Sequence, residues 1–266
     1  MSTPLPRLPA FYLPHGGGPC FFMDDPQRTW VGMANFLRAL PALLPIQPRA
    51  IVVVSGHWET QGFAATASPK PPLVYDYYGF PPHTYQLRYD APGDPALAET
   101  LVQHLREAGF TAATDPSRGL DHGVFVPLKV IYPQADIPVV ELSLDSGLDA
   151  DLHLSLGHAL APLRDQGVLL LGCGMSFHNL RAFGDPRALP PSKQFDDWLT
   201  EAVALPGTQR AVRLRDWAQA PAARIAHPRH EHLLPLMVSA GASTQPGRRI
   251  YNECVLGSMI SGFVFD

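Results

Sequence analysis

The sequence is poor in cysteine and has no long apolar run. Its 266 residues include only three cysteines, Cys20, Cys173 and Cys254. An odd number of widely spaced cysteines does not make a disulfide framework, and it fits reduced thiols in a cytoplasmic protein. No stretch approaches about 18 consecutive apolar residues, so we expect no spanning helix and no membrane partner. Prolines interrupt the apolar residues near the N-terminus, which argues against a signal peptide there.

Charge is scarce as well. Charged residues make up 17% of the chain, and the formal net charge is only -4. So small an acidic excess gives no reason to expect a nucleic-acid partner. Hydrophobic residues make up 46%, which is enough for a sizeable core and argues against extensive disorder. Because nothing in the sequence forces a division, we interpret residues 1–266 as a single domain.

Short apolar runs alternate with stretches of helical periodicity. The expected strands are Ala10–Leu13, Arg49–Ser55, Phe63–Thr66, Ile137–Leu144, Gly167–Gly172 and Val255–Phe265. The expected helices are Gln27–Leu40, Pro95–Ala108, Asp149–Leu163, Lys193–Leu205 and Glu231–Ala240. This alternation predicts an α/β sandwich with a central mixed, largely parallel sheet flanked by helices.

Four histidines, His15, His57, His178 and His232, follow or nearly follow buried segments, the last within the first turn of an expected helix. In an open α/β sheet the carboxyl ends of the strands converge on one crevice, where ligands bind. Neutral imidazole is the commonest protein ligand for zinc and iron. We therefore expect these side chains, which come from distant parts of the chain, to meet around one metal ion.

The glycines after His15 allow a second interpretation. A His-Gly-Gly-Gly segment forms the oxyanion hole of lipases and esterases. That chemistry requires a Gly-x-Ser-x-Gly turn, and the nearest segment, Gly174-Met-Ser176-Phe-His178, ends in the wrong residue. The sequence therefore argues against a serine esterase.

Two further features favour function over packing. His122 lies in an expected loop beside Asp121, which could orient or charge its imidazole for acid or substrate-anchoring work. The Tyr- and Pro-rich stretch Ser68–Gly93 is too aromatic for a linker, and loops of that length are usually functional.

For the remaining histidines in expected helices, the sequence gives no strong reason to expect a function. We expect His104, His153 and His158 on helix surfaces without partners. We expect His227 and His230 at an exposed helix entrance, although their i, i+3 spacing also allows a local metal pair.

Several longer segments occur in a specific order: Leu13-Pro-His-Gly-Gly-Gly-Pro, Ile51-Val-Val-Val-Ser-Gly-His-Trp, Tyr85-Gln-Leu-Arg-Tyr-Asp-Ala-Pro-Gly, Leu120-Asp-His-Gly-Val-Phe-Val-Pro-Leu, Ala135-Asp-Ile-Pro-Val-Val-Glu-Leu-Ser-Leu, Phe177-His-Asn-Leu and Glu231-His-Leu-Leu-Pro-Leu. Together they resemble the class III extradiol ring-cleaving dioxygenases, specifically the 4,5-DOPA dioxygenase-like group. One departure is Gly17-Gly18, where many members have Ser-Pro, followed by Cys20-Phe-Phe-Met. This departure would alter the pocket wall and the substrate range.

The resemblance implies a mononuclear non-haem Fe(II) centre in a single catalytic domain. On the matching positions the metal ligands would be His15, His57 and His232. His178 would be the neighbouring acid and base, or a fourth ligand where Zn(II) occupies the same place.

The resemblance also implies that the enzyme opens the ring of a catechol with O2. His122 would hydrogen-bond the substrate or an oxygen intermediate. The aromatic loop, including Tyr78, would cover the ring and exclude water.

Three alternatives stay open at this point. Glu231 rivals His232 as third ligand, because the wider superfamily, including protocatechuate 4,5-dioxygenase, uses two histidines and a glutamate. The same imidazoles would suit a zinc hydrolase. The third alternative is a non-enzymatic binding protein, because a relative, the mediator-of-motility protein, has the same fold and uses it to bind other molecules. The ring substituent and a homo-oligomeric state are not readable from the sequence.

Overall fold

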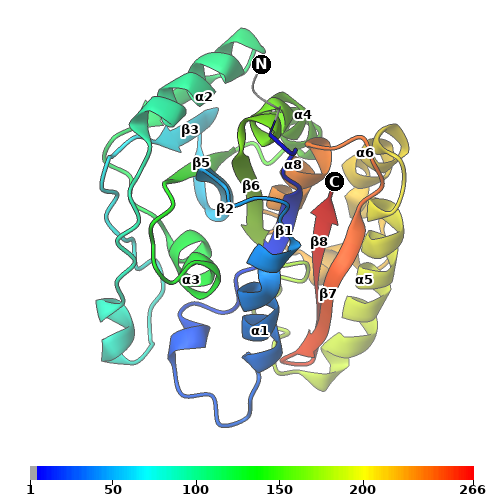
Figure 1. Ribbon diagram of the computed structural model, residues 1–266. Helices are drawn as coiled ribbons and strands as arrows, with labels where there is room; N and C mark the ends of the chain where they lie inside the picture. The colour runs from blue at the N-terminus through cyan, green and yellow to red at the C-terminus, as the bar shows by residue number, and fades with distance from the viewer. Residues whose placement is uncertain (1–4) are drawn as a thin grey trace.

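The β-branched run at residues 51–54 lies in the middle of an eight-stranded sheet (Figure 1). The structure, a computed structural model, describes residues 5–266, so the first four residues of the expected domain lie outside it. The strand order from edge to edge is β4-β3-β5-β2-β6-β1-β8-β7. The strands are β1 (Ala10–Pro14), β2 (Ala50–Thr60), β3 (Phe63–Thr66), β4 (Ala112–Asp115), β5 (Val139–Asp145), β6 (Val168–Gly174), β7 (Arg248–Val255) and β8 (Ser258–Phe265).

The four central strands β5, β2, β6 and β1 run parallel to one another. Towards one edge, β3 pairs antiparallel with β5 and parallel with β4. Towards the other, β8 pairs antiparallel with both β1 and β7. The sheet is therefore mixed with a parallel centre, which confirms the predicted fold class. Because the central strands point the same way, their carboxyl ends lie along one edge.

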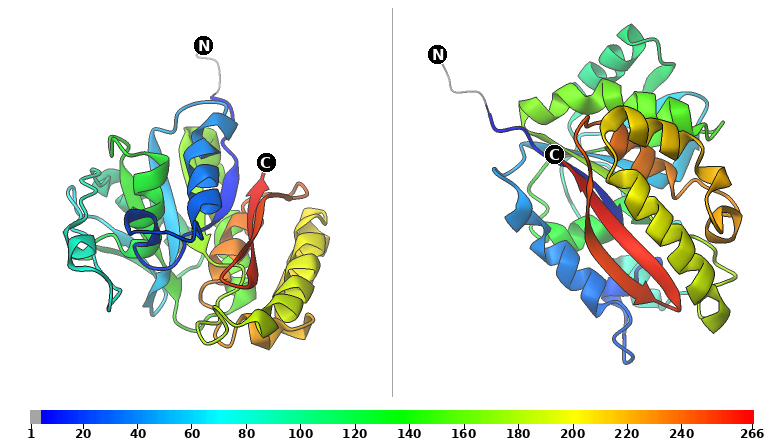
Figure 2. Two further views of the ribbon diagram at one scale, coloured as in Figure 1. Left: turned by 90° about the horizontal axis from the view of Figure 1, so that it is seen from below. Right: turned by 90° about the vertical axis from the view of Figure 1, so that its right-hand side faces the viewer.

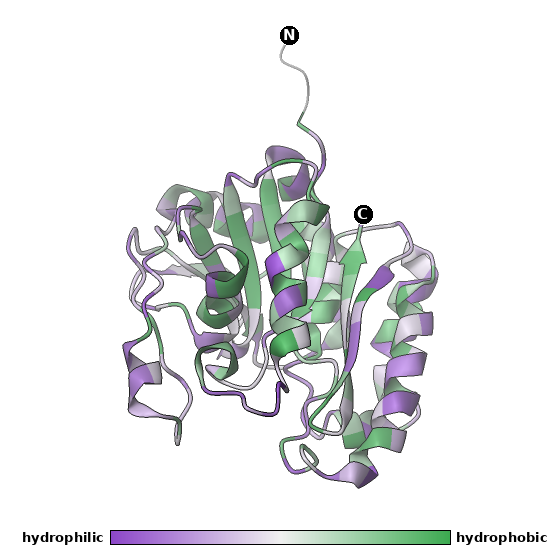
Figure 3. Ribbon diagram, turned by 60° about the horizontal axis from the view of Figure 1, so that its bottom comes forward, coloured by the Kyte–Doolittle hydropathy of each residue, from purple (hydrophilic) through white to green (hydrophobic). Residues whose placement is uncertain are grey.

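Helices cover both faces of this single α/β domain (Figures 1 and 2). They are α1 (Val31–Ala39), α2 (Pro95–Glu107), α3 (His122–Ile131), α4 (Ala150–Leu160), α5 (Leu189–Val203), α6 (Gly207–Arg215), α7 (Ala223–Ala226) and α8 (Leu234–Gly241). Helices α1 and α3 lie on one face, whereas α8 packs on the other face of β1 and β6, with α4 beside it. Apolar residues of the central strands and of these helices form the core (Figure 3). Within residues 5–266, no helix is both long and apolar enough to cross a membrane.

Two glycines of β6 bring the start of α8 against the sheet. A Cβ atom on Gly174 would lie 2.1 Å from the carbonyl oxygen of His232, and one on Gly172 would lie 2.2 Å from that of Pro235. These glycines make room for the segment that carries His232, because only a residue without a side chain fits at either position.

Several elements differ from the sequence-based expectation. The segment Val255–Phe265 is not one strand but the end of a hairpin, in which Gly257 occupies the turn with φ of 76°. Gly262 pairs with Tyr251 at the point where the register between β7 and β8 shifts. Strand β4 and helix α6 were not expected. The expected helix over Glu231–Ala240 begins later, at Leu234.

Candidate metal centre

Five histidines meet at the carboxyl edge of the central strands. His15 directly follows β1, and His57 lies in β2 at the point where its register with β5 shifts. His178 follows β6, His232 precedes α8, and His122 is the first residue of α3 rather than part of a loop. All except His232 line a cavity of about 570 Å³. The structure therefore brings together all five histidines that the sequence predicted for the site.

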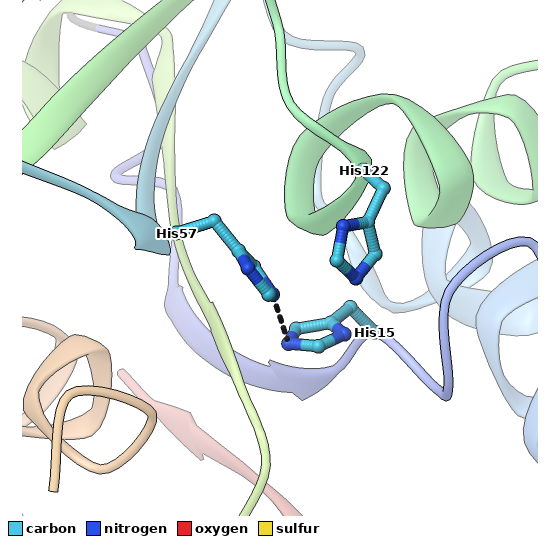
Figure 4. A group of neighbouring side chains, drawn as sticks. All are labelled: His15, His57 and His122. Carbon is cyan, nitrogen blue, oxygen red and sulfur yellow. Dashed lines mark hydrogen bonds between the residues drawn. The ribbon is translucent and has the colours of Figure 1, made fainter. Parts of the chain in front are cut away.

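Two short contacts among these rings join Nε2 atoms. Nε2 of His57 lies 3.3 Å from Nε2 of His15 and 3.0 Å from Nε2 of His232. His122 completes the group: its ligand atom and those of His15 and His57 all lie within 4.8 Å of one another. Figure 4 shows these three imidazoles turned toward a common point, from β1, β2 and α3.

Asp76 holds the far side of two of these rings. Its Oδ1 accepts a hydrogen bond from Nδ1 of His122 at 2.8 Å, and its Oδ2 lies 3.2 Å from Nδ1 of His57. Burial would raise the pKa of the Asp76 carboxyl, but the hydrogen bonds from His122 and His57 hold it well below its usual range. We call Asp76, His57 and His122 the Asp76 trio.

Glu231 plays the same part for the other two rings. Its Oε1 lies 2.8 Å from Nδ1 of His232 and 3.2 Å from Nδ1 of His178, and these two imidazoles stack at 3.4 Å between ring centroids. Burial would raise the pKa of Glu231, but its hydrogen bonds with His178 and His232 hold it well below the usual range. We call Glu231, His232 and His178 the Glu231 trio. Glu231 and His232 were expected to be rivals for one ligand position. In the structure they are hydrogen-bonded partners, because the Glu231 carboxylate accepts from Nδ1 of His232.

Burial sets the protonation of the enclosed imidazoles. It lowers the pKa of both His15 and His232 well below the usual range, and the neighbouring imidazoles lower them further. At His57 burial also acts to lower the pKa, but the hydrogen bond with Asp76 and nearby carboxylates outweigh it and raise the pKa. His15 and His232 are therefore neutral near pH 7, which is the form that binds metal ions.

Asp121 supports the site in a different way from the one expected. Its Oδ1 accepts a hydrogen bond from Oγ of Ser55 at 2.8 Å, and Ser55 in turn accepts one from the backbone N–H of His57 at 3.1 Å. Its Oδ2 lies 2.9 Å from Arg118. The expectation that Asp121 orients the imidazole of His122 is therefore wrong. Asp121 holds the main chain of β2, and Asp76 takes the role at His122.

The aromatic loop Ser68–Gly93 forms part of the cavity wall. Tyr77 is buried and packs edge-on against the ring of His122, with centroids 5.6 Å apart. Tyr78, which we predicted to contact substrate, also lines the cavity, but its side chain is 92% exposed at the mouth. Contact between Tyr78 and a substrate stays a prediction.

Other histidines lie outside this centre. His153 was expected on a helix surface, but it is fully buried and hydrogen-bonded, whereas His158 is exposed as expected. His227 is fully buried, and burial lowers its pKa to about 3. His227 and His230 each bond to a different main-chain carbonyl group, so they form neither an exposed helix entrance nor a metal pair.

Asp76 is the residue of the site that the sequence did not reveal. It lies in the loop, 46 residues before its hydrogen-bond partner His122. The available signal was indirect: an acidic residue inside an unusually aromatic loop that was already interpreted as functional.

Known proteins and one protein family match this chain over almost its whole length. Residues 9–261 match the family described as the catalytic LigB subunit of aromatic ring-opening dioxygenase. The chain is 39% identical over 261 residues to a 4,5-DOPA dioxygenase extradiol of Beta vulgaris, covering 95% of this chain and 94% of that protein. It is 35% identical over 275 residues to dioxygenase tasH of Hapsidospora irregularis, covering 96% and 85%. A crystal structure of an uncharacterized Escherichia coli K12 protein, 32% identical, superposes with a TM-score of 0.79 and covers 98% of this chain and 100% of that one.

Proposed function

The chain belongs to the LigB family of aromatic ring-opening dioxygenases, and on that premise we propose that it opens the ring of a catecholic substrate with O2 at a mononuclear Fe(II) site. The observation that carries this proposal is that Nε2 of one histidine lies within 3.3 Å of the Nε2 atoms of two others, beside the cavity. These atoms belong to His15, His57 and His232, which we propose as the metal ligands.

The donor set fits a metal ion. The Nδ1 atom of each proposed ligand faces an oxygen: Gly16 carbonyl for His15, Asp76 for His57 and Glu231 for His232. Because carbonyl and carboxylate oxygens only accept hydrogen bonds, each Nδ1 carries the proton and each Nε2 lone pair is free. Nitrogen ligands about 2.1 Å from one ion, at angles of roughly 90–110°, lie about 3.0–3.4 Å apart. The 3.0 and 3.3 Å separations here match that spacing.

The choice of metal follows from the reaction class. Three imidazoles suit both iron and zinc. We propose Fe(II) for activity, because an iron ion held by these residues would supply the electron transfer between a catechol and O2 that ring opening requires. Zn(II) would fit the same nitrogens.

Two histidines that are not in the proposed ligand set serve the substrate. The Nδ1 atom of His178 lies beside Glu231, which leaves Nε2 free to take a proton from a catechol hydroxyl and to return it later in the reaction. Proton transfer by such a positioned group contributes about 10²–10⁴-fold to rate. His122, held through Nδ1 by Asp76, would present its Nε2 to the substrate as a hydrogen-bond partner.

The cavity wall supports a flat substrate whose ring carries no carboxylate. Its aromatic lining includes Trp30, Tyr77, Phe80 and Phe183. Among residues 5–266, no lysine or arginine lines this cavity. A carboxylate on the ring would therefore lose water without gaining a cationic partner, which is unfavourable. We propose 4-methylcatechol as a better substrate than 3,4-dihydroxybenzoate, with DOPA, named in the relatives, as the reference.

Turnover by the reconstituted protein tests this function. The protein is loaded with Fe(II) under anaerobic conditions and then mixed with each catechol and O2. We expect one O2 consumed per catechol and a yellow, ring-opened product. Turnover of an ester or amide by protein loaded with Zn(II) alone, without O2 uptake, would instead support a zinc hydrolase.

A further inference from the structure

Asp76 stands between the two kinds of histidine in the proposed site. One of its neighbours, His57, is a proposed metal ligand, and the other, His122, is a proposed substrate partner. We propose that Asp76 is a positioning residue that couples metal binding to substrate binding by fixing both imidazoles at once. This inference rests on the proposed function, and it adds a role for the loop that carries Asp76.

The two oxygens of the Asp76 carboxylate contact different histidines. Oδ1 accepts two hydrogen bonds from His122, one from its backbone N–H at 3.0 Å and one from Nδ1 at 2.8 Å. Oδ2 lies 3.2 Å from Nδ1 of His57. Because the two oxygens belong to one rigid plane, a rotation of the carboxylate shifts both imidazoles together.

Capping of α3 alone does not account for this arrangement. His122 is the first residue of α3, and a carboxylate at a helix N-terminus is stabilising there. A cap needs only Oδ1, yet Oδ2 faces His57, a residue of a different element. The ring centroids of His57 and His122 are 4.0 Å apart, so the carboxylate bridges two imidazoles that are already in contact.

The loop fixes the position of Asp76 through the residues on either side. The hydroxyl of Tyr75 donates to the carbonyl of Leu87 at 2.6 Å, and that of Tyr77 donates to the carbonyl of Thr84 at 2.7 Å. Both bonds close within the loop Ser68–Gly93. The carboxylate therefore has a defined place even though it belongs to no strand or helix.

The loop and the start of α3 are also tied to each other. The backbone N–H of Val74 donates to the carbonyl of Leu120, and that of Leu120 donates to the carbonyl of Pro72, each at 2.8 Å. These bonds join the residues just before Asp76 to those just before His122. A change in the loop is therefore transmitted to the substrate side of the site.

Two binding constants measured on folded protein test the coupling. The first is the affinity for Co(II), measured by competition with a chromophoric chelator. The second is the affinity of the Co(II)-saturated protein for 4-nitrocatechol, measured by its visible spectrum. In Asp76→Asn we expect the Co(II) affinity to fall about 10–100-fold. We expect the 4-nitrocatechol affinity to fall roughly tenfold, since an amide cannot accept from both imidazoles as the carboxylate does.

Two companion variants separate coupling from simple structural damage. Asp90→Asn removes an exposed carboxylate of the same loop that pairs with Arg88 and does not line the cavity, and both affinities should stay within twofold of wild type. Asp76→Glu keeps the charge, which supports folding, but displaces both oxygens, so both affinities should fall. It also serves if Asp76→Asn does not fold.

The outcomes distinguish this inference from the proposed function. A loss confined to thermal stability, with both affinities unchanged in Asp76→Asn, would reduce Asp76 to a helix cap. A fall in only one affinity would contradict the coupling, while turnover of catechols by the wild type would leave the function standing. If Fe(II)-loaded wild type neither binds nor cleaves catechols, the function fails and the coupling with it.

Discussion

The Asp76 trio and the Glu231 trio share one plan but rest on different supports. In each, one carboxylate holds the Nδ1 atoms of two imidazoles. Glu231 adjoins His232, whose carbonyl accepts hydrogen bonds from the hydroxyl of Tyr12 at 2.8 Å and from the backbone N–H of Met175 at 3.2 Å. Tyr12 lies in β1 and Met175 directly follows β6, both strands of the buried sheet. Asp76 comes instead from a long loop.

The difference between a sheet support and a loop support indicates which function each trio is suited to. Segments packed in the core open only with large free energies, whereas loops with fewer buried contacts open more readily. The Glu231 trio is therefore suited to holding the proposed ligand His232 and the proposed acid/base residue His178 in a fixed arrangement. The Asp76 trio joins the proposed ligand His57 to the cavity wall that we propose receives the substrate. Mutations that loosen the sheet support should therefore weaken metal retention and spare substrate binding, whereas mutations that loosen the loop support should weaken both. The largest effects should lie in the Glu231 trio.

The strongest test removes the proposed ligand of the Glu231 trio. His232→Ala should lose the metal ion and reduce turnover by at least about 1000-fold, since the metal supplies several kcal/mol of stabilisation to the reaction. Metal content per chain and O2 uptake are the measurements. His158→Ala, an exposed substitution on α4, is the matched control and should change neither. Full metal retention in His232→Ala would assign the third ligand to another residue.

The second test stays in the same trio but spares the proposed ligands. His178→Ala should keep iron and catechol binding while kcat falls by at least about 100-fold, because the proton acceptor and donor is gone. Single-turnover kinetics and metal content check both parts. Loss of iron in this variant would make His178 a true ligand and give the Glu231 trio two of them.

The contrast between the trios also explains what the sequence could predict. The strand-end histidines were found because the carboxyl ends of parallel strands converge, and the apolar runs before them are unambiguous. Glu231 was noticed because it adjoins His232 in the sequence. Asp76 was missed because its partner His122 is 46 residues away and the loop between them has no periodicity that fixes its path.

Helix α3 was missed for a different physical reason. Of its ten residues only Lys129 is not buried, so it has no polar face and no amphipathic period. Pro127 inside it also argues against a helix in any analysis based on local preference. Tertiary packing between α1 and the sheet overrides both signals. Its first residue, His122, was therefore assigned to a loop although its role in the site was anticipated.

A milder change asks whether Glu231 is an orienting group or a ligand. In Glu231→Gln, the remaining carbonyl oxygen can still accept from Nδ1 of His232, so metal content should stay near that of wild type. Turnover should fall about tenfold, because the charge that steadies the imidazoles is lost. Glu201→Gln, an exposed change on α5, controls for the loss of one charge. Substantial metal loss in Glu231→Gln alone would transfer the third ligand position to Glu231.

The smallest expected effects come from one tyrosine hydroxyl in each support. Tyr12→Phe removes the hydrogen bond to the carbonyl of His232, and Tyr77→Phe removes the one to the carbonyl of Thr84. Each should lower the free energy of unfolding by about 0.5–1.5 kcal/mol, the usual net value of one hydrogen bond. Their other effects should differ, because Tyr12 holds the main chain of a proposed ligand and Tyr77 holds the substrate wall.

Metal titration and steady-state kinetics on the same two variants reveal that difference. Tyr12→Phe should weaken metal affinity a few-fold and leave KM for the catechol nearly unchanged. Tyr77→Phe should raise KM a few-fold and also weaken metal affinity, because it loosens Asp76, which contacts both His122 and His57. Since the two changes delete the same chemical group, an equally large rise in KM in Tyr12→Phe would mean that sheet and loop support the site as one unit. The assignment of different tasks to the two supports would then be wrong.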